Sequence, residues 1–193
     1  MSNEIIFDIE TIGDITDLST MEITVVSIYE YEHNTYSSFE RSELSKLWPI
    51  LEKCSLLIGY NSEHFDIPIL NRYYPGDLTT FPSLDLLKVI KDSIGRRLRL
   101  NDVAEATLDI TKSADGLQAM KWWKEGKIDE IKKYCEQDVK VTKEVYEFGK
   151  NNKQLFYKSL TGEVLPFAVN FDFGNPGKEN ANAKKNINLT LPF

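Results

Sequence analysis

The sequence contains few cysteines and no long apolar run. Its two cysteines, Cys54 and Cys135, are too few for a disulfide scaffold, and neither lies in a CxxC pair that would favour zinc. No apolar stretch approaches the length of a membrane span. The N-terminus also lacks the positive flank and apolar segment of a secretory signal. We therefore expect a protein of the reducing cytoplasm that has no membrane contact.

An excess of positive charge is also missing. The net charge of −7 at pH 7 argues against a protein that coats duplex nucleic acid non-specifically. It does not exclude a nuclease, because a site that gathers carboxylates around cations is itself acidic. One local cluster of basic side chains could follow a phosphate backbone or form a solvated helix face. It comprises Lys88, Lys91, Arg96, Arg97 and Arg99.

The order of apolar patterns predicts an α/β layer fold. Residues 4–10, 23–31 and 34–39 have the alternation and β-branched content of strands, and residues 56–60 are typical of a buried parallel strand. Helical spacing predicts the remaining elements. The predicted helices are 42–54 with Ser42 as N-cap, 61–74 after an opening turn, 84–94, 100–106, 116–124 and 129–148. Residues 156–173 alternate around Thr161-Gly162 and predict a closing hairpin.

The composition changes near residue 174. Gly174-Asn175-Pro176-Gly177 interrupts regular structure, and the residues that follow are polar. This predicts one domain over residues 1–173 and a flexible C-terminal tail over residues 174–193.

Two acids, Asp8 and Glu10, lie two positions apart on the first predicted strand. Their side chains therefore point to the same face, while Phe7 and Ile9 point to the other. Burying unpaired charge is costly, so two acids on one face of an apolar strand favour bound cations as compensation. The alternative is a strand end whose acidic face is exposed to solvent.

Two further segments carry acids in positions suited to a site. Asp66 follows a buried strand, where ligands bind in open α/β sheets. It could instead be a helix N-terminal acid that complements the dipole. Tyr134 and Asp138 are four residues apart and share a helix face. Tyr134 could also be an ordinary core tyrosine whose hydroxyl reaches the surface.

The four carboxylates together suit hard divalent cations. Mg²⁺ and Mn²⁺ take oxygen ligands, usually a few carboxylates with water and substrate phosphate. Two such ions can stabilise both the attacking and the leaving oxygen of a phosphodiester.

The order of these segments and the residues within them resemble the motifs of the DEDD 3′–5′ exonucleases. These enzymes belong to the ribonuclease H-like superfamily and include polymerase proofreading domains. The resemblance covers residues 1 to about 150. Three ordered motifs carry it: Phe7-Asp8-Ile9-Glu10-Thr11, Asn61 with Phe65-Asp66, and Tyr134-Cys135-Glu136-Gln137-Asp138-Val139. Lys133 stands where one branch has histidine. Tyr134 stands where the other branch has tyrosine, so the chain resembles the tyrosine (DEDDy) branch of family B polymerases.

The resemblance implies a ribonuclease H-like fold, with a mixed sheet flanked by helices, and two Mg²⁺ or Mn²⁺ ions per site. Asp8, Glu10 and Asp138 would bind the first ion. Asp8 would bridge to the second, on which Asp66 acts mainly through water, and Tyr134 would help to position the attacking water. Hydrolysis at the 3′ end of single-stranded nucleic acid, DNA or RNA, would release nucleoside monophosphates.

The resemblance also implies a set of substrate contacts. Thr11 would hold the terminal nucleotide, and Asn61 and Phe65 would contact its sugar or stack on a base. Phe65 may equally belong to the core. Asp85 is similar to an acid near these sites in polymerase relatives, or it caps a helix locally. We read Cys135 as a packing residue.

Two alternatives concern function beyond hydrolysis. A non-catalytic nucleic-acid or partner-binding module could retain this fold, although the complete set of acids disfavours it. The terminal residues Asn188–Phe193 resemble the short peptides that bind bacterial sliding clamps, which usually begin with Gln rather than Asn. The same segment could instead dock on its own domain.

Overall fold

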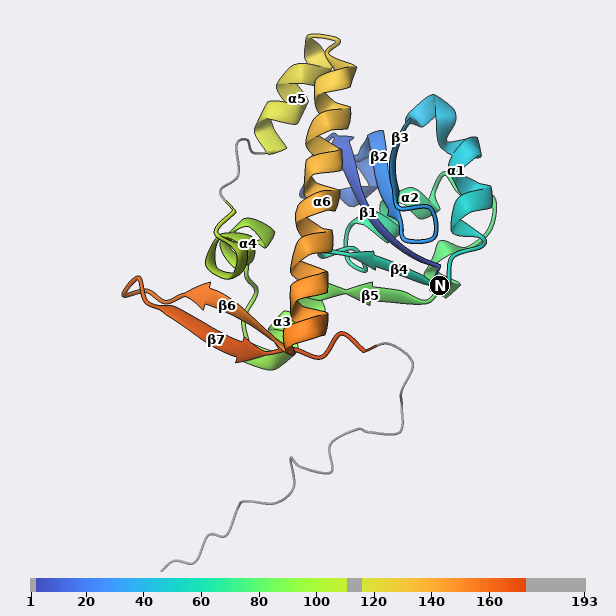
Figure 1. The fold of residues 1–193 in the computed structure, drawn as a ribbon. Helices are drawn as coiled ribbons and strands as arrows, with labels where there is room; N and C mark the ends of the chain where they lie inside the picture. The colour runs from blue at the N-terminus through green and yellow to red at the C-terminus, as the bar shows by residue number, and fades with distance from the viewer. Residues whose placement is uncertain (1–2, 111–115, 173–193) are drawn as a thin grey trace, which may run out of the picture.

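The computed structural model describes residues 3–110 and 116–172 (Figure 1), and the side chains of residues 116 and 117 are not described. The predicted tail over residues 174–193, with its clamp-like peptide Asn188–Phe193, lies outside the described residues.

A five-stranded mixed sheet forms the centre of the fold, in the order β3-β2-β1-β4-β5. The strands are β1 (Glu4–Ile12), β2 (Glu22–Glu30), β3 (Thr35–Glu40), β4 (Leu56–Gly59) and β5 (Ser83–Asp85). β2 pairs antiparallel with both β1 and β3, whereas β1, β4 and β5 run parallel. The predicted α/β fold with a mixed sheet is confirmed.

Helices cover both faces of this sheet (Figure 1). Their bounds are α1 (Leu44–Leu51), α2 (Asp66–Asn71), α3 (Leu86–Ile94), α4 (Leu100–Leu108), α5 (Gly116–Lys124) and α6 (Ile128–Asn152). The antiparallel pair of β6 (Gln154–Lys158) and β7 (Val164–Ala168) forms the predicted hairpin. Across the described ranges, the structure contains no helix with the length and apolar character needed to cross a membrane.

The two faces of β1 belong to different halves of the core. Ile5, Phe7 and Ile9 pack with the buried leucines of α1 and with α2. Ile6 packs on the opposite side, against Val139 and its neighbours on α6. Because side chains alternate along a strand, Asp8 and Glu10 continue the face of Ile6 toward α6.

Two predicted helix starts are wrong. Ser42 does not cap a helix, because Arg41–Glu43 forms a 3₁₀ turn in which the Glu40 N–H donates to Glu43 Oε2 at 3.3 Å. The predicted helix over 84–94 begins two residues later, at Leu86, because Leu84 belongs to β5. Asp85 ends that strand and caps α3.

The long helix α6 passes close to the segment that follows β7. Gly149 and Phe171 are both buried, and a Cβ atom added at Gly149 would overlap Phe171 Cε2. The glycine therefore lets Phe171 pack directly on the helix backbone. This contact lies near the C-terminal end of α6, away from Tyr134 and Asp138.

We expect Gly149→Ala to lower the free energy of unfolding by about 1–3 kcal/mol, because a packed core resists added volume. This loss should outweigh the gain of about 1 kcal/mol in helix propensity. Urea unfolding measures the difference, and Lys140→Ala, an exposed position on the same helix, should change stability by less than about 0.5 kcal/mol. A Gly149→Ala protein as stable as the wild type would show that this contact is not tight.

Candidate active site

Three carboxylates converge where β1 meets α6. Asp8 and Glu10 come from β1, Asp138 comes from α6, and one ligand oxygen from each lies within 4.8 Å of the others. The two-residue spacing on a strand and the position of Asp138 on the buried face of α6 produce this convergence. The three acids predicted to bind the first cation are thus brought together.

Two of these three acids are largely removed from solvent, and Asp8 is half-buried. Glu10 is 8% exposed and Asp138 is 9% exposed. Like charges this close repel strongly where water cannot screen them. Several carboxylate oxygens in one small space form the donor set that Mg²⁺ and Mn²⁺ prefer, so the residues fit a divalent cation.

Asp66 lies beside this cluster but is not one of the three acids within 4.8 Å. It is the first residue of α2, and its Oδ1 accepts a hydrogen bond from the N–H of Ile9 at 3.3 Å. β4 pairs with β1 only as far as Ile6, so Asp66 meets a backbone donor beyond the end of that ladder. The fourth predicted acid thus contacts the strand between Asp8 and Glu10.

Burial controls the protonation of Asp66. The side chain is 5% exposed, and desolvation raises the pKa of its carboxyl to about 7, although the N–H of Ile9 favours the charged form. In the absence of cations, Asp66 therefore changes charge near neutral pH.

Tyr134 and Cys135 lie on α6 one turn before Asp138. Tyr134 is buried, and its ring packs edge-on against Trp122 of α5 with centroids 6.1 Å apart. Cys135 is fully buried, and its thiol donates to the backbone oxygen of Asp8 at 3.3 Å and to Asp8 Oδ2 at 3.6 Å. We read Cys135 as packing, but it also touches a site acid. The sequence did contain a signal for this contact, because Cys135 lies on the same helix as the site residues, next to Tyr134 and one turn before Asp138.

A cleft of about 690 Å³ opens next to Glu10. The register of β1 against β2 shifts between Glu10 and Thr11, and both residues line the cleft. Thr11 and Phe65, two predicted substrate contacts, both line it, and Phe65 also packs against the core. The other lining residues are Ile9, Gly13, Asp14, Ile15, Met21 and Met120.

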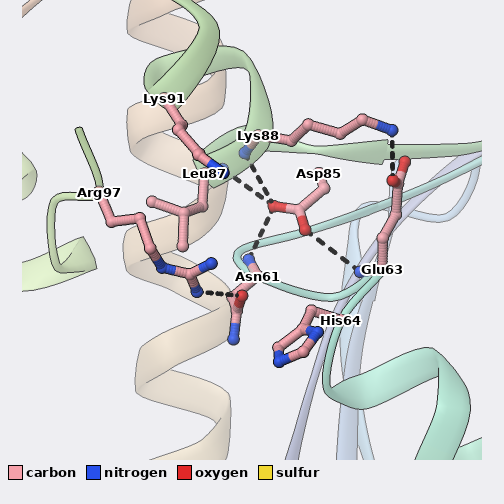
Figure 2. Close-up of a pocket in the computed structure, with 8 residues that line it drawn as sticks. All are labelled: Asn61, Glu63, His64, Asp85, Leu87, Lys88, Lys91 and Arg97. Atoms are coloured by element: carbon pink, nitrogen blue, oxygen red, sulfur yellow. Dashed lines mark hydrogen bonds and ion pairs between the residues drawn. The ribbon is translucent and has the colours of Figure 1, made fainter. Parts of the chain in front are cut away.

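Asn61, the third predicted substrate contact, lines a separate cavity (Figure 2). Its backbone has a left-handed φ of 65°, its N–H donates to Asp85 Oδ1 at 2.8 Å, and its side-chain oxygen accepts from Arg97 at 2.6 Å. Sequence reasoning could not place Arg97 here, because the contact joins residues 36 positions apart.

Asp85 organises the loop between β4 and α2. Its carboxylate caps α3 by accepting the N–H groups of Leu87 at 2.9 Å and Lys88 at 3.4 Å. The same carboxylate accepts the N–H groups of Asn61 at 2.8 Å and Glu63 at 3.2 Å (Figure 2). Asp85 therefore fixes the loop that leads to Phe65 and Asp66.

Comparison with known proteins agrees with this geometry. The sequence model of the RNase_H superfamily matches residues 5–148, which include the three converging acids and Asp66. The chain belongs to the RNase_H superfamily. No curated protein matches it in sequence.

Similarity to a solved structure also supports the RNase H-like fold. The chain is similar to the family B DNA polymerase from the hyperthermophilic archaeon Pyrobaculum calidifontis, with a TM-score of 0.58 and 16% sequence identity. The similarity covers 76% of this chain and 24% of the polymerase chain. At this identity it shows a shared RNase H-like architecture.

The raised pKa of Asp66 predicts a pH-dependent stability for the metal-free protein. Its folded pKa of about 7 lies above the ordinary value of 3.8, so the folded state holds a proton that the unfolded chain releases. The stabilisation is complete below pH 4 and is lost as the pH rises to about 7. Urea unfolding in EDTA should therefore show Asp66→Asn gaining stability relative to wild type across that window. A difference between the two proteins that does not vary with pH would contradict this assignment.

Proposed function

We propose that this RNase_H superfamily member is a metal-dependent 3′–5′ exonuclease of the DEDDy type. It would act on single-stranded nucleic acid, with DNA favoured over RNA, and release nucleoside monophosphates. The observation that carries the proposal is the convergence of Asp8, Glu10 and Asp138 within 4.8 Å, with Asp66 hydrogen-bonded to the strand between the first two.

The four acids provide the metal ligands in this proposal. Asp8, Glu10 and Asp138 would hold one cation, and Asp8 would also hold a second, on which Asp66 would act mainly through water. Bound Mg²⁺ or Mn²⁺ would lower the pKa of water and offset the charge that develops on the scissile phosphodiester. The buried setting of Glu10, Asp66 and Asp138 strengthens their hold on a cation, because little water competes.

Tyr134 is assigned to orienting the attacking water. It lies on the same face of α6 as Asp138, one turn away, and the edge-on contact with Trp122 restrains its ring. A tyrosine hydroxyl held by a packed ring can donate a hydrogen bond in a fixed direction.

The cleft beside Glu10 is assigned to the 3′-terminal nucleotide. Its volume of about 690 Å³ lies within the usual range for small-molecule sites. Phe65 offers an aromatic face on which an unpaired base can stack, and Thr11 offers a hydroxyl to the sugar. Stacking on Phe65 requires a base that is not paired, which favours single-stranded substrates.

We expect wild-type protein with Mg²⁺ or Mn²⁺ to shorten 5′-labelled single-stranded DNA one nucleotide at a time from the 3′ end. Asp8→Asn should reduce the rate by about 10³-fold or more, since loss of a ligand removes several kcal/mol of transition-state stabilisation. Asp129→Asn is the matched control, because it changes an exposed acid at the start of the same helix that carries Asp138. A gel time course with equal-sequence DNA and RNA measures direction and preference.

Three outcomes would reject parts of this proposal. Wild-type and Asp8→Asn proteins of equal activity would exclude the carboxylate site. Internal cleavage products would exclude an exonuclease. Tight binding of the strand by a wild type that never hydrolyses it would favour the non-catalytic alternative.

Tyr134→Phe tests the role of the hydroxyl separately from the ring. We expect a fall of about 10- to 100-fold in kcat, because loss of a positioning group typically has this effect. Affinity for single-stranded DNA in EDTA should not change, and circular dichroism should show an unchanged melting temperature within about 2 °C. An unchanged kcat would assign Tyr134 to the core alone.

A further inference from the structure

A small basic cavity lies apart from the cleft beside Glu10, and Figure 2 shows the residues that line it. Its volume is about 170 Å³, and four segments contribute to it: the loop between β4 and α2, the end of β5, helix α3, and the loop after α3. The residues lining this basic pocket are Asn61, Glu63, His64, Asp85, Leu87, Lys88, Lys91 and Arg97.

The two acids of the basic pocket are already engaged. Asp85 directs its oxygens to four backbone N–H groups. Glu63 forms an ion pair with Lys88 at 2.5 Å. Lys91 and Arg97 therefore give the pocket an excess of positive charge, and within the described ranges neither forms an ion pair with a carboxylate.

Arg97 and Asn61 form a preorganised pair of donors. The Arg97 guanidinium donates one N–H to the Asn61 side-chain oxygen at 2.6 Å, which fixes both groups. The guanidinium has five N–H donors and the amide has two, so this bond leaves several donors for a ligand. Guanidinium and ammonium groups on one small cavity favour a phosphate over a nucleobase.

The basic pocket and the cleft beside Glu10 share one loop. His64 lines the basic pocket, and the next residue, Phe65, lines the cleft. Consecutive Cα atoms are about 3.8 Å apart, so the two cavities are lined from neighbouring positions of this loop.

We propose that the basic pocket binds the backbone phosphate of the single strand that lies one nucleotide to the 5′ side of the scissile phosphate. This inference rests on the proposed function, because it requires a nucleic acid strand in the cleft. Lys91 and Arg97 supply the charge, and Asn61 and His64 lie where the strand passes between the two cavities. The local positive charge offsets the repulsion between the phosphate backbone and a chain of net charge −7.

Binding is tested in EDTA, where the strand stays intact. Fluorescence anisotropy of a labelled single-stranded DNA 10-mer over a KCl series gives the slope of log K against log salt. Lys91→Gln and Arg97→Gln should each weaken binding about 5-fold or more and reduce the slope by about 0.7, as expected for one lost phosphate contact.

Arg96→Gln is the matched control for charge. Arg96 adjoins Arg97 in sequence, but its guanidinium lies over the Tyr157 ring at 4.4 Å and it lines a different cavity. It should leave the affinity and the slope nearly unchanged. Equal effects of Arg96→Gln, Arg97→Gln and Lys91→Gln would overturn the assignment, because only general charge would then matter.

A minimal substrate separates this inference from the proposed function. The p-nitrophenyl ester of thymidine 5′-monophosphate carries only the scissile phosphate and no further phosphate beyond it, so Lys91→Gln should hydrolyse it at the wild-type rate while its KM for the 10-mer rises. If the wild type hydrolyses neither substrate, the exonuclease proposal fails and the salt series still tests the pocket. If hydrolysis is normal and the KM of Lys91→Gln for the 10-mer is unchanged, the pocket assignment fails alone.

Discussion

The cost of burying negative charge governs this structure. β1 carries Asp8 and Glu10 toward α6 on the same face that Ile6 uses for core packing, so the acids enter a region with little water. Asp138 joins them from the opposite element, and their oxygens lie within 4.8 Å of one another. Burying several carboxylates in so small a space is costly, and the raised pKa of Asp66 is one expression of that cost.

The surrounding backbone holds these acids in place through a few buried hydrogen bonds. β4 is shorter than β1, which leaves the Ile9 N–H available to Asp66 beyond the end of the parallel ladder. Asp85 then ties the loop that follows β4 to the start of α3. An apolar side chain at either position would still fill the space. Only an oxygen acceptor, however, satisfies the buried N–H groups, and each such group left without a partner costs about 1–3 kcal/mol.

Local periodicity explains what could be predicted from the sequence. The two-residue spacing of Asp8 and Glu10 and the four-residue spacing of Tyr134 and Asp138 determine shared faces without knowledge of the fold. The α/β layer fold followed from the order of apolar segments, and the mixed sheet followed only from the resemblance to the DEDD exonucleases. β5 was missed because Ser83–Asp85 is too short to show alternation, and Ser42 was misplaced because a 3₁₀ turn precedes α1. Asn61 lines a different cavity from Thr11 and Phe65. The hydrogen bonds that hold it there, to Asp85 and Arg97, join residues distant in sequence, so the sequence pattern could not predict them.

The left-handed backbone at Asn61 has an evolutionary consequence. Glycine adopts a φ of 65° most easily, yet the residue here carries an amide that bonds to Arg97. Asparagine is the side chain that best tolerates this conformation while offering both a donor and an acceptor. Replacement by glycine would keep the turn and lose the amide, and replacement by a branched residue would strain the turn. The position therefore accepts very few alternatives, and divergence among related sequences should be low there even where the neighbouring surface changes freely.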